Sequence, residues 1–249
     1  MFDIHKIKPV HGWREFFGEV GIIVLGVLIA LAAESLVERW RWHEETEQNR
    51  EAIKRDLYAS ALNAWERLGV EPCLRGRLSD LLARVDANRG DWKSSPMPRR
   101  PERERTTVVS PAYAPPSRYY LTDAWKDALA SGSFQHLSAD DAANFSVAFS
   151  SVQEMADAQA REASAATRLS PLSFNLRLDA RSKIDMIAAI AEVDRSLLLM
   201  DAVSAELLDN VRGLKLGFDP QMERRDRAAI FADQRYHRGF CVVDPHVAL

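Results

Sequence analysis

The longest apolar run in the chain covers residues 16–37, with the sequence FFGEVGIIVLGVLIALAAESLV. Its centre, residues 20–33, holds only apolar and small residues. A membrane-spanning helix needs about 20 mostly apolar residues and satisfies its backbone groups internally. Residues 16–33 supply most of that length, and Glu19 is their only ionisable side chain. We therefore predict a transmembrane helix over residues 16–37.

Tryptophans stand on both sides of this run. Trp13 precedes it, and Trp40 and Trp42 follow it. At a rise of about 1.5 Å per residue, Trp13 and Trp40 are about 40 Å apart along a helix. That distance separates the two aromatic belts at the interfaces of a bilayer, so we interpret the three side chains as an interfacial belt.

Two other interpretations of the run remain open. A secretory signal peptide has a basic start, a short apolar region and a small-residue cleavage site, and Ala30-Leu31-Ala32 fits the last of these. Glu19 interrupts its apolar entry, and no Gly or Pro occurs between Val27 and Leu68, which favours a helix that continues. The run is also compatible with the core helix of a soluble protein, but the flanking tryptophans then need a separate explanation.

One face of the predicted span carries small residues and a carboxylate. At 100° per residue, this face consists of Glu19, Ile23, Gly26, Ala30 and Ala33. Gly26 and Ala30 form a small-xxx-small pair, which lets two helices approach closely. The face predicts self-association or binding of a membrane protein partner, with Glu19 at its cytoplasmic end. The alternative is a lone span whose Glu19 reaches the headgroups.

Beyond the span, the pattern predicts a polar stalk and then a helical domain. Residues 38–52 include HEETEQNREA, which is polar on every face. From Ile53, apolar positions recur at helical spacing and mark the start of a bundle domain over residues 53–249. Gly69 to Pro72 is expected to break the first helix, and a second helix should end near Gly90.

Residues 91–117 should form a loop, because they contain six prolines and the arginines Arg99, Arg100, Arg103 and Arg105. The patch suggests contact with anionic lipid or with an acidic partner surface. A solvated linker, in which Glu102 and Glu104 partly cancel the arginines, is the other possibility.

Three more helices are expected after this loop. Thr122 should cap a short helix that Gly132 ends, and Ser138 should cap a longer one that Pro171 ends. The inward positions of the longer helix are predicted to be Phe145, Phe149, Val152, Ala156 and Ala163.

Ser170 is placed to cap a central helix that continues to Gly213, and Asp219-Pro220 should open a last helix that ends before Gly239. No alternating strand pattern is evident, so the sequence predicts an all-α helical bundle.

Charge and composition bear on topology and partners. The 249 residues are 47% hydrophobic and 28% charged, with a net charge of −3, which gives no general attraction to nucleic acid. Three Lys or Arg precede the span in residues 1–14, against Arg39 and Arg41 after it. The positive-inside rule therefore favours a short cytoplasmic tail, residues 1–15, with the bulk of the chain outside.

The run HGWREFFGEVGIIVLGVLIALAAE with its continuation ERWRWHEE resembles the amino-terminal signature of single-pass inner-membrane proteins of proteobacteria. The later segment TDAWKDALASGSFQHL is also similar to that group. The resemblance implies a membrane anchor with a helical extramembrane domain. The family carries no established activity, so it transfers no catalytic residues.

The sequence carries few signs of a catalytic or metal site. No two of the six histidines lie at helical spacing, and His43 beside Glu44, Glu45 and Glu47 reads as solvated surface rather than a metal site. Phosphate loops, dinucleotide fingerprints and nucleophile elbows are not found. We therefore predict no catalytic residue, no metal, no cofactor and no enzyme activity.

The leading function is a structural or interaction role; a sensory or ligand-binding module that signals through a membrane partner is the alternative.

Cys73 and Cys241 are the two cysteines. Cys73 is expected in the turn after the stalk helix and Cys241 just after the last helix, so we predict one disulfide in an oxidising periplasm. Closing this loop would stabilise the domain by roughly 4 to 5 kcal/mol. Two free thiols are expected instead if the domain faces the cytoplasm. Geometry decides, because the Cα atoms must lie within about 7 Å.

Overall fold

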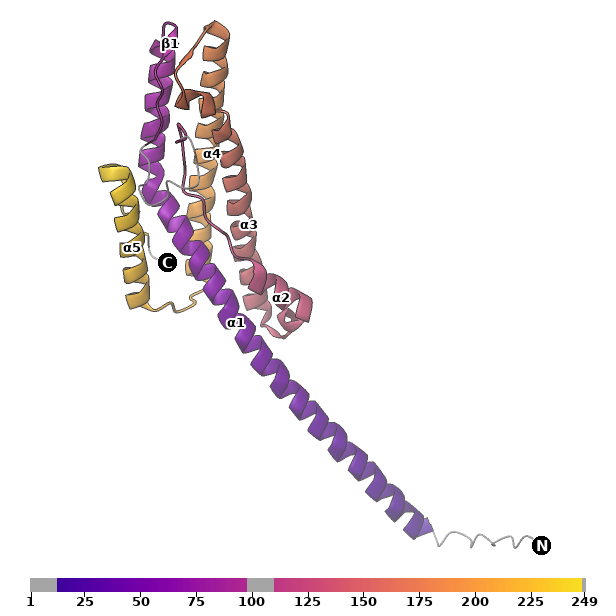
Figure 1. Ribbon diagram of the computed structural model, residues 1–249. Helices are drawn as coiled ribbons and strands as arrows, with labels where there is room; N and C mark the ends of the chain where they lie inside the picture. The colour runs from indigo at the N-terminus through magenta and orange to yellow at the C-terminus, as the bar shows by residue number, and fades with distance from the viewer. Residues whose placement is uncertain (1–12, 98–109, 248–249) are drawn as a thin grey trace, which may run out of the picture. The chain divides into compact units, whose positions relative to one another are not determined.

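The computed structural model describes residues 13–97 and 110–247. Within these ranges the fold is all-α, with two strands of two residues each (Figure 1). The helices are α1 (Trp13–Ala87), α2 (Asp123–Ser131), α3 (Ala139–Thr167), α4 (Ala180–Gly213) and α5 (Pro220–Arg238). The strands are β1 (Asp91–Trp92) and β2 (Leu176–Arg177), and the short 3₁₀ turns are η2 (Ser133–His136), η3 (Ser170–Ser173) and η4 (Gly239–Cys241).

The chain divides into two compact units, residues 1–48 and residues 49–249, and α1 contributes to both. In the second unit, α3 and α4 run side by side, and α2 lies at one end of this pair (Figure 1). Two apolar clusters fill the interior. The first cluster gathers residues 53–65 of α1, residues 145–158 of α3 and residues 200–211 of α4. The second cluster gathers residues 70–85 of α1 and residues 189–197 of α4 around Leu169 and Leu172.

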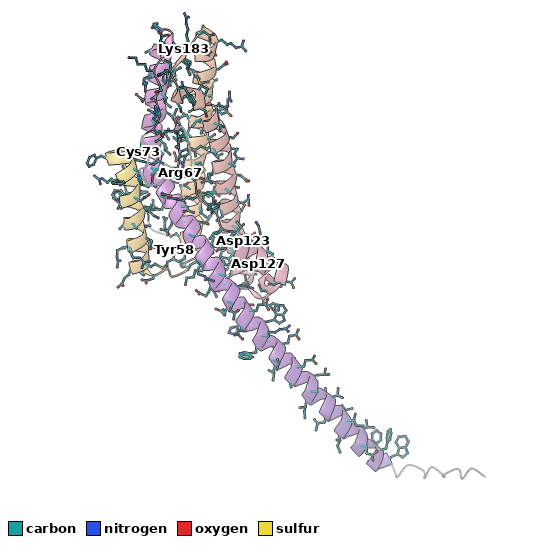
Figure 2. The ribbon with its side chains drawn as sticks, viewed as in Figure 1. Tyr58, Arg67, Cys73, Asp123, Asp127 and Lys183 are labelled. Carbon is teal, nitrogen blue, oxygen red and sulfur yellow. A yellow bond between two sulfur atoms is a disulfide. The ribbon has the colours of Figure 1, made fainter. Side chains whose placement is uncertain are left out.

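The expected helix break at Gly69 to Pro72 is wrong. α1 continues through both residues to Ala87. Proline lacks one backbone N–H, so Pro72 removes a single helical hydrogen bond, and burial of the flanking Val70 and Leu74 in the second cluster holds the helix together. The helix changes direction between Arg67 and Cys73 (Figure 2), which is the usual effect of an internal proline.

Several predicted helix ends are confirmed. The Ser138 side chain accepts a hydrogen bond from the Asp141 N–H at 3.0 Å, and α3 begins there. Asp219 accepts one from the Gln221 N–H at 2.8 Å at the start of α5. Gly132 ends α2 with a φ of 81°, in the left-handed region. Thr122 is the N-cap residue of α2, but its side chain makes no capping hydrogen bond.

The assignment of Ser170 as the cap of the central helix is wrong. Ser170 begins η3, and α4 starts at Ala180, where Asp179 accepts a hydrogen bond from the Ser182 N–H at 2.8 Å. The residues between them leave the helical conformation because β2 pairs antiparallel with β1. Strands of two residues are too short to show an alternating pattern, so the sequence could not reveal them.

The predicted inward face of α3 is only partly correct. Phe145, Phe149 and Val152 are buried, but Ala156 is half-buried and Ala163 is exposed. The buried face winds around the helix, because α3 packs in the first cluster with one side and in the second cluster with another. The arginines Arg99, Arg100, Arg103 and Arg105 of the proline-rich loop lie outside the described residues.

Candidate functional sites: an exposed apolar helix and a buried polar layer

In the first unit, the amino-terminal part of α1 presents apolar side chains to its surroundings on every face. Within the described part of the chain it is the one helix long and apolar enough to cross a membrane, and its most apolar 18-residue window has a mean hydropathy of 2.5 with no residue buried. Ile22 is 73% exposed and Ile23 is 65% exposed. An exposed apolar surface of this size marks a membrane or partner contact. A signal sequence has the same character.

The predicted residues of this segment lie along the helix as expected from its periodicity. Glu19, Ile23, Gly26, Ala30 and Ala33 are all exposed. Their role in helix packing stays a prediction.

The aromatic residues near the start of α1 form a group. Trp13 is exposed, and its ring lies 6.3 Å from that of Phe16 and 5.7 Å from that of Phe17. At the other end of the run, Trp40 is exposed, and the Arg41 guanidinium lies 5.7 Å from the Trp42 ring.

In the second unit, a layer of polar side chains lies between the two apolar clusters. We call it the polar layer, and it comprises Glu66 and Arg67 of α1, Tyr113 and Arg118 of the segment after residue 110, Glu162 of α3, Asp201 of α4 and Gln234 of α5. Sequence reasoning missed this layer. The available signal was Arg67, which shares the helical phase of the buried Ala64 and Val70.

The centre of the layer is the ion pair of Arg67 and Glu162. Arg67 Nη2 donates to Glu162 Oε1 at 2.5 Å, and the Tyr113 hydroxyl donates to the same oxygen at 2.7 Å. Burial acts to lower the pKa of Arg67, but Glu162 and Tyr113 outweigh it and raise that pKa. Burial also raises the pKa of Tyr113 well above its usual value, so its hydroxyl stays a donor.

A second group joins three elements through Glu66. Arg118 Nε donates to Glu66 Oε2 at 2.5 Å, and Gln234 Nε2 donates to Glu66 Oε1 at 2.7 Å. Gln159 holds the backbone of Arg118, since its Oε1 accepts from the Arg118 N–H at 2.8 Å and its Nε2 donates to the Arg118 carbonyl at 2.9 Å. Glu66 therefore ties α1 to α5 and to the segment after residue 110.

Asp201 lies at the edge of the layer, between the buried pair and the surface. Arg75 Nη2 donates to Asp201 Oδ2 at 3.3 Å, and Arg75 also contacts Glu71 and lies 3.8 Å from Asp194. Burial raises the pKa of Asp201 to about 7, and the nearby carboxylate of Glu71 adds to the effect. Asp201 Oδ1 is buried without a hydrogen-bond partner among the described residues.

The fully buried carboxylates of this layer are paired with arginines. Glu66 is held by Arg118, and Glu162 is held by Arg67. Within residues 13–97 and 110–247, no three His, Cys, Asp or Glu side chains are grouped as metal ligands would be. Buried ion pairs of this kind add little net stability, because the cost of removing two charges from water offsets much of their attraction.

A shallow groove of about 370 Å³ lies at the surface between residues 111–117 and α3. Its lining is mostly proline and alanine, and includes Tyr113, Ala160 and Ala163. Such a lining has few polar groups to orient a ligand.

The two cysteines meet in the second unit. Their Cα atoms are 5.0 Å apart and their sulfurs are at bonding distance, 2.05 Å. The expected position of Cys73 in a turn is wrong, because Cys73 lies within α1 (Figure 2). Cys241 follows the last helix as expected, in η4.

No family model, curated protein or solved structure significantly matches this chain.

Proposed function

We propose that this chain is a membrane-anchored helical-bundle protein with a structural or protein-interaction role at the outer face of a bacterial inner membrane. The observation that carries the proposal is the wholly exposed apolar surface of residues 16–33 at the start of α1. Hydrocarbon is the solvent in which such a surface is stable. The tryptophans at its two ends support the same placement.

The bundle domain supports an interaction role over a catalytic one. Its buried carboxylates are held by arginines, and its interior is filled by two apolar clusters. The partners we propose are the lipid bilayer and either a second copy or another membrane protein, which would pack on the Glu19, Gly26 and Ala30 face. Nucleic acid is not among them, because the net charge is −3.

The proximity of Cys73 and Cys241 supports the outward orientation, since disulfides persist in oxidising compartments. The weak charge asymmetry around the span and the resemblance to proteobacterial single-pass proteins agree with that orientation.

A ligand-binding or sensory module is the second candidate. The groove along α3 is the observation that favours it. Such a module would signal through a membrane partner. A secreted helical protein, released after cleavage of a signal peptide, is the remaining alternative for the amino-terminal segment.

The test is to express the full chain with a carboxy-terminal tag, extract the membranes with alkaline carbonate and sequence the mature amino terminus. We expect the chain to stay in the membrane with residues 16–37 intact. A start at Ala33 or Glu34 would establish the signal-peptide alternative. The matched control is the Ala32→Leu variant, which blocks small-residue cleavage and should behave as the wild type if no cleavage occurs.

Co-purification in mild detergent then separates the two roles. A stoichiometric protein partner supports the interaction role, and a bound small molecule supports the sensory one.

A further inference from the structure

The last part of the chain is attached to the bundle differently from the other helices. We call residues 219–247, which include α5 and η4, the C-terminal strap. Within α5, whose residues are all described, Gln234 is the one buried residue. By contrast, ten residues of α4 are buried. The packing of the strap on the first cluster uses side chains that are only partly buried, Ile230, Phe231 and Val247, and individual contacts with α1 add to it.

These contacts follow one side of α1, where Figure 1 shows α5 beside it. The Tyr58 hydroxyl donates to Asp226 Oδ2 at 3.0 Å, and the Arg227 guanidinium lies 5.3 Å from the centre of the Trp65 ring. Gln234 donates to Glu66.

The end of the strap contacts the next turn of α1. The Val243 N–H donates to the Gly69 carbonyl at 3.0 Å, and Val242 is buried. Cys241 forms the disulfide with Cys73, which lies one helical turn beyond Gly69 in α1. The strap therefore covers Trp65, Glu66 and Gly69.

The connection at the other end of the strap is a turn, and its side chains Leu214, Leu216 and Phe218 pack against the first cluster. Residues 214–219 link α4 to α5 without helical structure, and Lys215 and Gly217 have φ values of 50° and 63°. Left-handed residues of this kind mark turns rather than rigid helical continuations. The disulfide is thus a covalent tie to α1 at the opposite end of the strap from this turn.

The disulfide is also open to reagents, since Cys241 is exposed and Cys73 is half-buried. We propose that the Cys73–Cys241 disulfide is a redox latch, whose reduction releases the C-terminal strap from α1 and uncovers the face formed by Trp65, Glu66 and Gly69. The bundle of α1, α3 and α4 stays folded when the latch opens, because the buried side chains that form its two apolar clusters come from other elements, and Ile230, Phe231 and Val247 of the strap are only partly buried against the first cluster. This inference rests on the oxidising compartment of the proposed function, but not on the membrane anchor.

The reaction is a two-electron reduction by a thiol donor such as a small dithiol or a dithiol oxidoreductase. Its thiolate attacks the exposed sulfur of Cys241, the S–S bond breaks, and Cys73 leaves as a thiolate that takes a proton from solvent. A second thiol of the donor then attacks the mixed disulfide, frees the Cys241 thiol and leaves the donor oxidised as a disulfide.

The face that opening would uncover combines an aromatic and an acidic side chain. Trp65 and Glu66 are almost fully covered in the closed state, with exposed fractions of 2% each. Opening therefore removes the cover of the strap from the side of the Trp65 ring that Arg227 contacts, from a carboxylate that Arg118 still holds, and from a glycine with no side chain. Flat aromatic surfaces with a charged rim are typical of protein contact sites.

The test is hydrogen exchange of the full chain in detergent micelles, with and without the phosphine reductant TCEP, read by mass spectrometry. We expect peptides from residues 219–247 to exchange about tenfold faster or more after reduction, while peptides from α3 and α4 keep their protection. Alkylation of the two new thiols, seen as added mass, shows that reduction is complete.

Two results would overturn the latch. The strap peptides could keep their protection after both thiols are alkylated, in which case non-covalent contacts suffice to hold the strap. Protection could also be lost throughout the domain, in which case the disulfide is a general staple of the fold.

Variants supply the matched control. Cys241→Ser should show fast exchange in the strap without reductant, and TCEP should then cause no further change. If this variant does not fold, the comparison of the oxidised and reduced wild type still decides between the outcomes.

Discussion

Arg67 of α1 and Glu162 of α3 form an ion pair whose side chains are 2% and 0% exposed, with Nη2 and Oε1 2.5 Å apart. Both residues stand between the two apolar clusters. A shift of either helix by one turn would bury a lone charge among apolar side chains, which costs several kcal/mol. The pair therefore fixes the register of α3 against α1.

Replacing Glu162 by Gln should destabilise the domain by about 3 to 5 kcal/mol, because Arg67 is then buried without a counter-charge. Chemical denaturation of the purified protein measures this change. The double variant Arg67→Met with Glu162→Leu should recover part of the loss, since apolar side chains of similar size suit a dry site. If Glu162→Gln is as stable as the wild type, the ion pair does not matter for the stability of the domain.

The stability of the domain should depend on pH through Asp201. Its pKa is raised from 3.8 to about 7 in the folded state, so the folded protein binds a proton that the unfolded chain has already lost in this range. Stability linked to this group is present in acid and is lost as the pH rises from about 4 through about 7.

Asp201→Asn keeps the side chain neutral, so it should raise the thermal midpoint at pH 8 more than at pH 5. The control is Asp194→Asn, which also lies near Arg75 but is more exposed. If the thermal midpoint of Asp201→Asn changes between pH 5 and pH 8 by as much as that of the wild type, Asp201 is not the source of the pH dependence.

Gly69 should not tolerate a side chain. A Cβ there would lie 2.9 Å from the Val243 carbonyl oxygen, which belongs to the backbone. Gly69→Ala is therefore expected to destabilise the domain by about 1 to 3 kcal/mol. Gly76 in the same helix has open space around it, so Gly76→Ala should instead stabilise by about 0.5 to 1 kcal/mol. Thermal unfolding of both variants gives the comparison, and equal effects would contradict the close approach at Gly69.

The small-residue face of the apolar segment should mediate association in the membrane. Replacing Gly26 and Ala30 together by Leu adds side chains that push two helices apart, so cross-linked species in membranes should decrease. The control is Val20→Leu with Val24→Leu, which places two leucines on another side of the helix. If both pairs leave the cross-linking pattern unchanged, this face has no role in association.

Much of the fold could be predicted because helical periodicity and caps are local signals. The caps at Ser138 and Asp219 and the end of α2 at Gly132 were each visible in a few neighbouring residues. Pro72 was misleading, because packing on both sides outweighs one missing hydrogen bond. Ser170 was misleading for a similar reason, since the pairing of β1 with β2 is a contact between distant segments.

The polar layer could not be predicted because its partners come from five separate parts of the chain. Arg67 shares a helical phase with apolar residues, and this was the visible sign of a buried charge. Its partner Glu162 is 95 residues away, and nothing in the sequence singles it out from the other carboxylates. The apolar segment of α1 could be predicted for the opposite reason, because its residues follow one another in a single stretch of the sequence.

The disulfide also determines which fragments a protease can release. Cys73 lies within α1 and Cys241 lies after α5, so the bond closes a covalent ring around most of the second unit. A single cut anywhere between the two cysteines would open this ring without releasing a fragment, because both pieces remain joined through sulfur. Shedding of the domain from its amino-terminal segment would then require either a cut before Cys73 or a cut combined with reduction.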